Sequence, residues 1–386
     1  MRAPFFYYSR SMNLVFAFDS FKGSMTSAQA NEAAAAAARS LFPDAGISTF
    51  RMADGGEGTV AALAPALGCT IAHESVPGPT GDETDAVYAF NSLSGVAIIE
   101  SAAASGLTLV PREKRNVMRA SSFGTGVQIA NALRRGASHI ILGVGGTACV
   151  DGGTGLLQAL GARFCDAKCR LLPTGTHILS EIASIDTTAM IVTDARFTIL
   201  NDVDTPLCGK HGAAPVFGPQ KGATPEQIEI LSKGLANFAA IAAGELADIP
   251  GGGAGGGIAG ALHRFFNAAI VPGADTVLEL GGFDTLASAA NLIFTGEGSL
   301  DRTTLCGKAP LAVLRRARAL GKKVVAIGGR VDAREALLSA GFDAVEASTP
   351  AGTPPAVAMN TEFATTALGR AVENYLMTHF NRSNSF

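Results

Sequence analysis

The stretch 292–310 constrains the fold most, because an apolar segment runs directly into a glycine-rich acidic loop and then into a helical pattern. This order is typical of a doubly wound α/β sheet, in which loops at the carboxyl ends of parallel strands bind ligands. Glycines let a backbone approach a ligand, carboxylates can hold Mg²⁺, and a lysine can neutralise an oxyanion. The sequence therefore predicts phosphate chemistry here. The candidate residues of this stretch are Gly296, Glu297, Gly298, Asp301 and Lys308.

A second segment, near the start of the chain, has the same design. The apolar run 13–18 is followed by a polar loop that contains Asp19, Ser20 and Lys22, and then by a helical pattern. The first strand of a doubly wound sheet usually lies beside a later strand at the topological switch point. We therefore expect Asp19 and Lys22 to face the acidic loop of Glu297.

Further acidic or glycine-rich loops occur along the rest of the chain. Asp151 could be a plain helix N-cap, but its flanking glycine pairs favour a site role. Lys221 fits a surface lysine and a phosphate ligand equally well. The glycine run 251–257 could be a phosphate-cradling loop or a hinge, and no strong strand precedes it as a dinucleotide fingerprint requires. The candidate binding or catalytic residues of these loops are Asp54, Gly55, Gly56, Glu57, Gly145, Gly146, Thr147, Asp151, Asp202, Lys221, Gly255 and Gly256.

Composition excludes several classes of protein. A net charge of −3 without a basic cluster argues against a nucleic-acid partner. No apolar run approaches the roughly 18 residues of a membrane span, and six irregularly spaced cysteines suggest a reducing compartment. We expect a cytoplasmic protein without a membrane partner. The sequence carries no signal for an oligomeric state.

Length and element order predict two α/β domains in these 386 residues. A linker rich in proline and glycine ends near residue 80, and regular alternation of strands and helices resumes near residue 275. We expect residues 12–80 and 275–386 to form one discontinuous domain around a parallel sheet of five strands. Residues 81–274 would be an inserted α/β domain, and residues 1–11 an extension or a loose tail.

Six of these loops, taken together and in order, resemble those of the class I bacterial glycerate kinases. They are 19–24, 53–59, 145–153, 202–207, 217–223 and 295–301, the last followed by 307–310. The resemblance implies a flavodoxin-like, doubly wound domain interrupted by a second domain described as restriction-enzyme-like. It also implies ATP-dependent phosphorylation of D-glycerate, generally to 2-phosphoglycerate, with Mg²⁺, at a cleft between two domains.

Under this interpretation, different charged residues have different roles in phosphoryl transfer. Glu297 and Asp301 would hold Mg²⁺ directly or through water. Asp19 is the first choice to orient the attacking hydroxyl or accept its proton, with Asp54 and Asp202 as rivals. The lysines expected to neutralise phosphate and carboxylate charge are Lys22 and Lys308, with Lys221 as a third candidate.

Two other classes of protein share these features. A metal-dependent phosphatase, or a phosphotransferase acting on another small hydroxy acid, also needs carboxylates and lysines. A non-catalytic sensor of a hydroxy acid would need fewer of them. A requirement for ATP separates the kinase from the phosphatase, and ADP formation separates it from the sensor.

Overall fold

The computed structural model describes residues 12–242 and 245–380. The tail expected at residues 1–11 lies outside this described part of the chain. No helix between residues 12 and 380, the two uncertain positions aside, is both long and apolar enough to span a bilayer.

The described chain forms two compact units, one of residues 12–53 with 274–380 and one of residues 54–273. The first boundary lies earlier than the residue 80 expected from composition. The reason is that strand β3 (Thr70–Pro77) pairs along its whole length with β4 (Glu83–Asn91). Strand β3, which ends just before residue 80, therefore belongs to the sheet of the second unit.

The first unit is built around a parallel sheet with the strand order β15-β13-β11-β1-β2. Its strands are β1 (Asn13–Phe18), β2 (Gly46–Thr49), β11 (Leu292–Gly296), β13 (Lys323–Gly328) and β15 (Ala344–Ala347). The three central strands are almost continuously apolar because both faces of the sheet are covered, as parallel sheets require. These are the five strand segments expected from the sequence.

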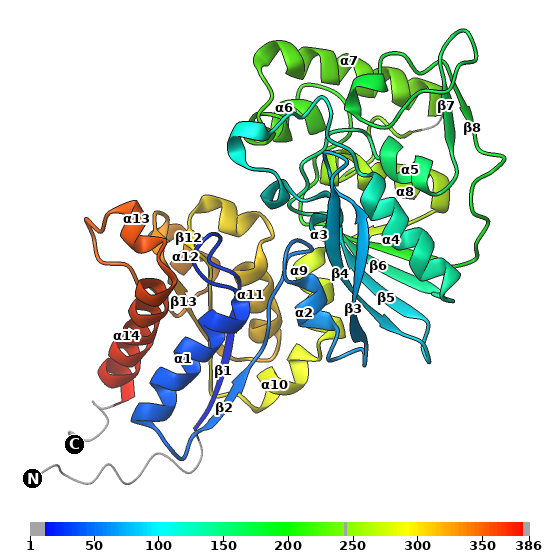
Figure 1. The fold of residues 1–386 in the computed structure, drawn as a ribbon. Coiled ribbons are helices and arrows are strands. Elements are labelled where there is room, and N and C mark those ends of the chain that lie inside the picture. The colour runs from blue at the N-terminus through cyan, green and yellow to red at the C-terminus, as the bar shows by residue number, and fades with distance from the viewer. Residues whose placement is uncertain (1–11, 243–244, 381–386) are drawn as a thin grey trace, which may run out of the picture. The chain divides into compact units, whose positions relative to one another are not determined.

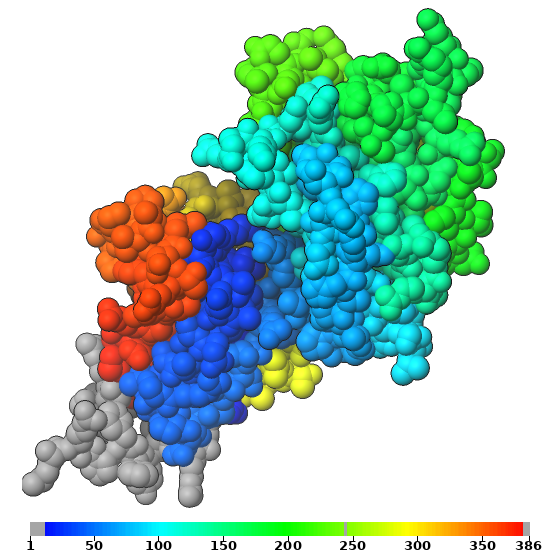
Figure 2. All heavy atoms as spheres, viewed as in Figure 1, coloured from blue at the N-terminus to red at the C-terminus, as the bar shows by residue number. Residues whose placement is uncertain are grey.

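Helices cover both faces of this sheet. On one face α1 (Ser27–Leu41) and α14 (Thr361–Phe380) lie side by side, as Figures 1 and 2 show. They enclose a core in which the rings of Phe16 and Phe294 stack with centroids 5.1 Å apart. On the other face α11 (Ala309–Ala319) packs against the central strands. The smaller elements are α9 (Gly273–Leu280), α10 (Phe283–Ala289), β12 (Ser299–Leu300), η6 (Arg302–Cys306), β14 (Arg330–Val331), α12 (Arg334–Ala340) and α13 (Pro355–Ala358).

The second unit has a mixed sheet with the order β10-β9-β6-β5-β4-β3. Four strands run parallel, namely β5 (Val96–Glu100), β6 (His139–Gly143), β9 (Arg196–Leu200) and β10 (Ala269–Val271). Strands β3 and β4 complete it as an antiparallel pair. The carboxyl ends of the parallel strands therefore lie along one edge, where loops are available for ligands.

Helices and two short strands surround this second sheet. The helices are α2 (Thr59–Leu63), α3 (Ser101–Ser105), α4 (Phe123–Arg134), α5 (Thr154–Ala159), α6 (Ala213–Phe217), α7 (Pro225–Ala242) and α8 (Ile258–Phe266). A separate hairpin pairs β7 (Arg163–Cys165) with β8 (Ser184–Asp186). The rings of Phe164 and Phe238 meet edge to face in the core, with centroids 6.0 Å apart.

Candidate functional site

The loops after β1 and β11 lie against each other within the first unit. The two strands pair in parallel register up to Phe18 and Gly296, and the amide of Asp19 then donates to the carbonyl oxygen of Gly296 at 2.9 Å. A Cβ atom added to Gly298 would lie 3.5 Å from the Cα of Phe21 and 3.8 Å from the amide nitrogen of Lys22. The structure thus brings the loop of Asp19 and Lys22 to the acidic loop, as the strand order predicted.

Glu297 lies at the centre of the acidic loop and is largely buried. Its Oε1 accepts a hydrogen bond of 2.7 Å from the Thr304 hydroxyl, and its Oε2 is 3.4 Å from the Nζ of Lys308. Burial raises the pKa of Glu297, and the contacts to Thr304 and Lys308 oppose that rise. Glu297 and Lys308 are therefore close enough to act on one ligand.

Asp301 caps the short helix η6. Its Oδ1 accepts from the amide of Thr303 at 2.7 Å and from the hydroxyl of Thr303 at 2.5 Å. The hydroxyl bond is the main cause that lowers the pKa of Asp301. The amide of Asp301 donates in turn to the Thr304 hydroxyl at 3.2 Å, so Thr304 connects Asp301 to Glu297. Sequence reasoning missed Thr304, although its position three residues after an N-cap aspartate was a usable signal.

Asp19 is held tightly at the end of β1, with 7 % of its surface exposed. Its Oδ1 accepts from the amide of Ser20 at 2.7 Å, whereas Lys22 is exposed to solvent. Behind the loop, the buried Asn31 donates to the carbonyl oxygen of Phe18 at 3.3 Å and accepts from its amide at 2.9 Å. Asn31 is a second residue that sequence reasoning missed, since an asparagine inside an alanine-rich helix gives no local sign of this role.

The acidic loop fits Mg²⁺ in one particular way. Among the described residues, no three His, Cys, Asp or Glu side chains lie close enough to form a metal site by themselves. Glu297 and Asp301 carry carboxylate oxygens, the hard type of ligand that Mg²⁺ prefers, on one loop. Mg²⁺ is commonly held by one or two carboxylates together with water and substrate phosphates. The donor set therefore suits a metal that arrives with a nucleotide better than a permanently bound one.

In the second unit, the loops at the carboxyl edge of the sheet converge. The amide of Gly145 donates to the carbonyl oxygen of Gly55 at 3.0 Å, and the amide of Gly273 donates to Oδ1 of Asp202 at 2.8 Å. A Cβ on Gly273 would lie 2.4 Å from the carbonyl oxygen of Asp54, so these backbones are in direct contact. The structure therefore brings together the loops of Asp54, Gly55, Gly145 and Asp202.

The remaining candidates of this edge differ in exposure. Asp54 accepts from the amide of Gly56 at 3.1 Å, which closes the turn of the loop. Glu57 and Gly146 are exposed, whereas Gly56 is buried. Gly55 has a φ of +87° and faces the carbonyl oxygen of Leu200, where a Cβ would lie at 2.4 Å. Both observations explain why this position is a glycine.

Lys221, Thr147 and Asp151 lie in the interior of the second unit. Lys221 is only 4 % exposed, so its interpretation as a surface lysine is wrong. Its Nζ donates to the Thr147 hydroxyl at 3.1 Å and to the carbonyl oxygen of Cys149 at 2.6 Å, and burial lowers its pKa. Asp151 is fully buried, and its Oδ2 accepts from the amide and the hydroxyl of Ser122, each at 2.8 Å. These contacts anchor loops inside the protein.

The glycine run 251–257 packs closely on a neighbouring loop. Gly255 and Gly256 have φ values of +64° and +70°. A Cβ on Gly256 would lie 2.1 Å from the carbonyl oxygen of Cys149, and the Gly256 carbonyl accepts from the amide of Gly152 at 2.9 Å. Close backbone packing therefore accounts for glycine at Gly256.

The chain is similar to known proteins over most of its length. The chain matches the model of the glycerate kinase family over residues 14–379. It is 41% identical over 344 residues to a glycerate kinase of Halalkalibacterium halodurans, covering 87% of this chain and 90% of the relative. It is 38% identical over 324 residues to a glycerate 2-kinase of Escherichia coli strain K12, covering 82% and 85%. A crystal structure described as a glycerate kinase 2 from Salmonella typhimurium LT2 has a TM-score of 0.81 and 36% identity, covering 97% and 99%.

The fold and these relatives define an α/β enzyme with one parallel and one mixed sheet. The chain belongs to the glycerate kinase family, which consists of kinases that use an alcohol group as acceptor.

Proposed function

We propose that this enzyme phosphorylates D-glycerate with ATP and yields a phosphoglycerate, with 2-phosphoglycerate as the expected product. Membership of the glycerate kinase family supports the reaction class. The observation that carries the proposal is the parallel pairing of β1 with β11, because it sets the loop of Asp19 and Lys22 against the loop of Glu297. Carboxylates and lysines in adjoining loops suit a reaction between an anionic substrate and a nucleotide.

Charge neutralisation is the first requirement of such a reaction. Phosphoryl transfer depends on positioning and electrostatic stabilisation more than on covalent chemistry. Lys22 and Lys308 are the proposed cations, and Lys308 directly precedes the amino terminus of α11, whose amides also favour anions. Lys221 is proposed to contribute through the loop of Thr147, since its Nζ already bonds to that hydroxyl.

Metal binding and proton removal complete the proposal. Glu297 and Asp301 would hold Mg²⁺, which when bound supplies positive charge next to the phosphates. Asp19 is the proposed residue that orients the acceptor hydroxyl or takes its proton, because its carboxylate is fixed by the neighbouring amide. Asp54 and Asp202 remain the alternatives.

The proposal includes a fold assignment. Counted within the first sheet alone, the strand order is 2-1-3-4-5, which is the order of flavodoxin-like doubly wound domains. The second unit is contained in sequence between the two parts of the first. We propose that it is an inserted α/β domain of the restriction-enzyme-like kind. The glycines of its carboxyl edge, with Asp151 and the run at Gly255, would contribute to substrate or nucleotide binding.

The experiment is a direct assay of the purified protein with D-glycerate, ATP and Mg²⁺. Formation of ADP that depends on D-glycerate is the expected result, and NMR of the product identifies the phosphorylated hydroxyl. Parallel reactions without ATP, with phosphoglycerates as substrates, test for a phosphatase. Binding of D-glycerate without any ADP formation would refute the proposal and favour the alternative of a non-catalytic hydroxy-acid sensor.

A further inference from the structure

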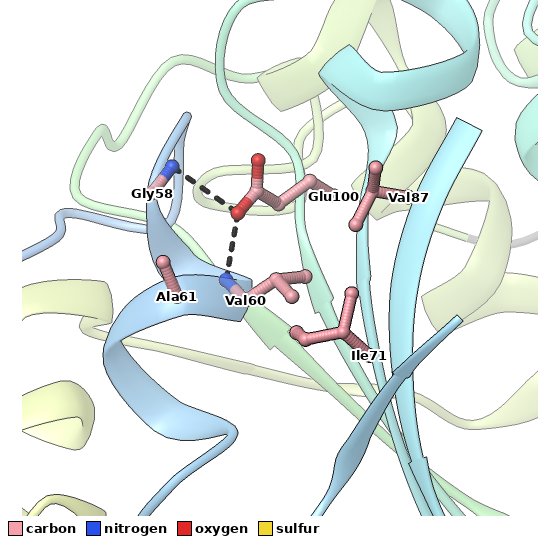
Figure 3. Close-up of a pocket in the computed structure, with 6 residues that line it drawn as sticks. All are labelled: Gly58, Val60, Ala61, Ile71, Val87 and Glu100. Carbon is pink, nitrogen blue, oxygen red and sulfur yellow. Dashed lines mark hydrogen bonds between the residues drawn. The ribbon is translucent and has the colours of Figure 1, made fainter. Parts of the chain in front are cut away.

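Glu100 is a half-buried acid that none of the roles above uses. It is the last residue of β5, at the carboxyl edge of the second sheet. Its Oε1 accepts from the amide of Gly58 at 3.1 Å and from the amide of Val60 at 2.6 Å, as Figure 3 shows. One carboxylate oxygen thus holds the point where the Asp54 loop turns into α2.

The surroundings of Glu100 strengthen these two bonds. An open pocket of about 210 Å³ adjoins the carboxylate, and Figure 3 shows the residues that line it. Its lining is Gly58, Val60, Ala61, Ile71, Val87 and Glu100. Burial raises the pKa of Glu100, the bonds from Val60 and Gly58 oppose that rise, and the nearby charge of Glu57 adds to it. Hydrogen bonds to a charged acceptor in such an apolar setting are stronger than bonds between neutral groups.

The Asp54 loop is rich in glycine, so it needs tertiary contacts to hold it in one conformation. Three of its residues are glycines, and Gly55 and Gly58 have φ values of +87° and +98°. Glycine gains conformational freedom in the unfolded chain, so a glycine loop has a high entropic cost of ordering. At one end the Gly55 carbonyl is fixed by the amide of Gly145 at 3.0 Å. At the other end, the Glu100 carboxylate fixes the loop by accepting hydrogen bonds from the amides of Gly58 and Val60.

We infer that Glu100 is a positioning residue, whose carboxylate fixes the Gly58 end of the loop so that Asp54 and Glu57 are presented to substrate in a single geometry. The inference rests on the proposed function, in which this loop binds substrate. Three amides of this segment already have carboxylate acceptors within the protein: those of Gly58 and Val60 donate to Glu100, and that of Gly56 donates to Asp54.

Three variants test the inference. Glu100→Ala removes both bonds, whereas Glu100→Gln retains an oxygen that can accept them. Glu74→Ala is the matched control, because Glu74 lies on β3 of the same sheet, has a pKa raised by burial, and bonds to Asn131 on α4 instead of to the loop. The first readout is hydrogen exchange of residues 54–63, which does not depend on activity. We expect faster exchange of these residues in Glu100→Ala alone.

The second readout is steady-state kinetics with D-glycerate and MgATP. Because bonds to a charged acceptor are lost, we expect Glu100→Ala to raise a substrate KM or lower kcat by about tenfold or more. Glu100→Gln should recover activity to within about threefold of wild type, since its amide oxygen still accepts. Thermal unfolding shows whether each variant is folded, and Glu100→Gln keeps the test valid if Glu100→Ala does not fold.

The outcomes separate this inference from the proposed function. If wild type makes no ADP from D-glycerate, the proposed function fails, and the exchange measurement still tests whether Glu100 orders the loop. Wild-type exchange or wild-type kinetics in folded Glu100→Ala overturns the inference. So does a folded Glu100→Gln variant with a defect as large as that of Glu100→Ala.

Discussion

The amide of Asp19 donates a hydrogen bond to the carbonyl oxygen of Gly296 at 2.9 Å, just beyond the last paired residues of β1 and β11. This bond extends the backbone contact of the two strands into their loops. The relative position of the loops is therefore set by main-chain atoms. Side chains in these loops can consequently be exchanged to test chemistry without removing what holds the loops together.

The first prediction concerns proton removal by Asp19. Asp19→Asn keeps an oxygen for the bond from the Ser20 amide but removes the charge and the basic oxygen. We expect kcat to fall by roughly two to four orders of magnitude, because general base catalysis contributes about that much. The KM for D-glycerate should stay within about twofold, since ground-state contacts persist. Steady-state kinetics measures both.

The control for Asp19→Asn is Asp284→Asn, an exposed aspartate on α10 that pairs with Arg316. An exposed ion pair contributes only about 0–1 kcal/mol to stability. Asp284 has no proposed role in the reaction, so kcat should not change. A near-normal kcat in Asp19→Asn would exclude Asp19 as the general base. The same substitution at Asp54 and Asp202 would then identify the residue responsible.

The second prediction concerns the metal. Glu297→Gln removes one of the two proposed carboxylate ligands while leaving an oxygen for the Thr304 hydroxyl. We expect the Mg²⁺ concentration for half-maximal activity to rise by about tenfold or more, which corresponds to about 1.4 kcal/mol. Chelation of Mg²⁺ with EDTA should abolish wild-type activity. Glu279→Gln, whose side chain is 72% exposed, is the control and should keep the wild-type requirement. An unchanged requirement in Glu297→Gln would remove this residue from the metal site.

The third prediction concerns packing at the end of β11. In Gly296→Ala the new Cβ would lie 1.8 Å from the carbonyl oxygen of Ile327 on β13, so the strands must separate. We expect a loss of stability of about 2 kcal/mol or more, as overpacked sites commonly show. In Gly298→Ala the new Cβ meets its nearest atom at 3.5 Å, and stability should stay within about 0.5 kcal/mol. Denaturant unfolding compares the two, and equal stabilities would contradict the prediction.

The fourth prediction concerns pH and His139, at the start of β6. Its Nδ1 lies 2.9 Å from the guanidinium of Arg196, and its Nε2 lies 2.9 Å from the Thr198 hydroxyl. Burial and the charge of Arg196 lower the pKa of His139 from 6.5 to about 4. Between these two pH values the unfolded chain binds more protons than the folded protein, so stability falls as pH decreases through this window.

The measurement is the unfolding temperature of wild type and of His139→Gln from pH 7 to pH 4. His139→Gln cannot titrate at this position, so its unfolding temperature should fall less steeply with decreasing pH. Other acids titrate in both proteins, which makes the difference between the two curves the meaningful quantity. Parallel curves would show that His139 makes no such contribution.

Much of the first unit follows from local sequence patterns. Continuous apolar runs of five or six residues, such as 13–18 and 292–296, indicate buried parallel strands. Polar loops after such runs must meet at the carboxyl edge if the strands are neighbours. The contact between the loops of Asp19 and Glu297 could therefore be predicted from the sequence alone.

The environment of single polar side chains could not be predicted in this way. The sequence left a surface position and a ligand role equally open for Lys221 and gave no exposure for Asp151, yet both are buried with protein partners. Glu100 reads as an ordinary residue at a strand end, although it bonds to amides about 40 positions away in sequence. Such roles depend on distant segments, so local patterns carry no signal for them.

The sequence by itself determined the parallel sheet of the first unit, the loops that follow its strands, and the chemical groups that those loops carry. These features depend on apolar periodicity and on which residue types turns accept, and both are local properties. The tertiary structure alone decided that residues 54–80 belong to the second unit, whose sheet they join through the pairing of β3 with β4. It also decided which carboxylates and amines are buried, because burial depends on what distant parts of the chain place around a side chain.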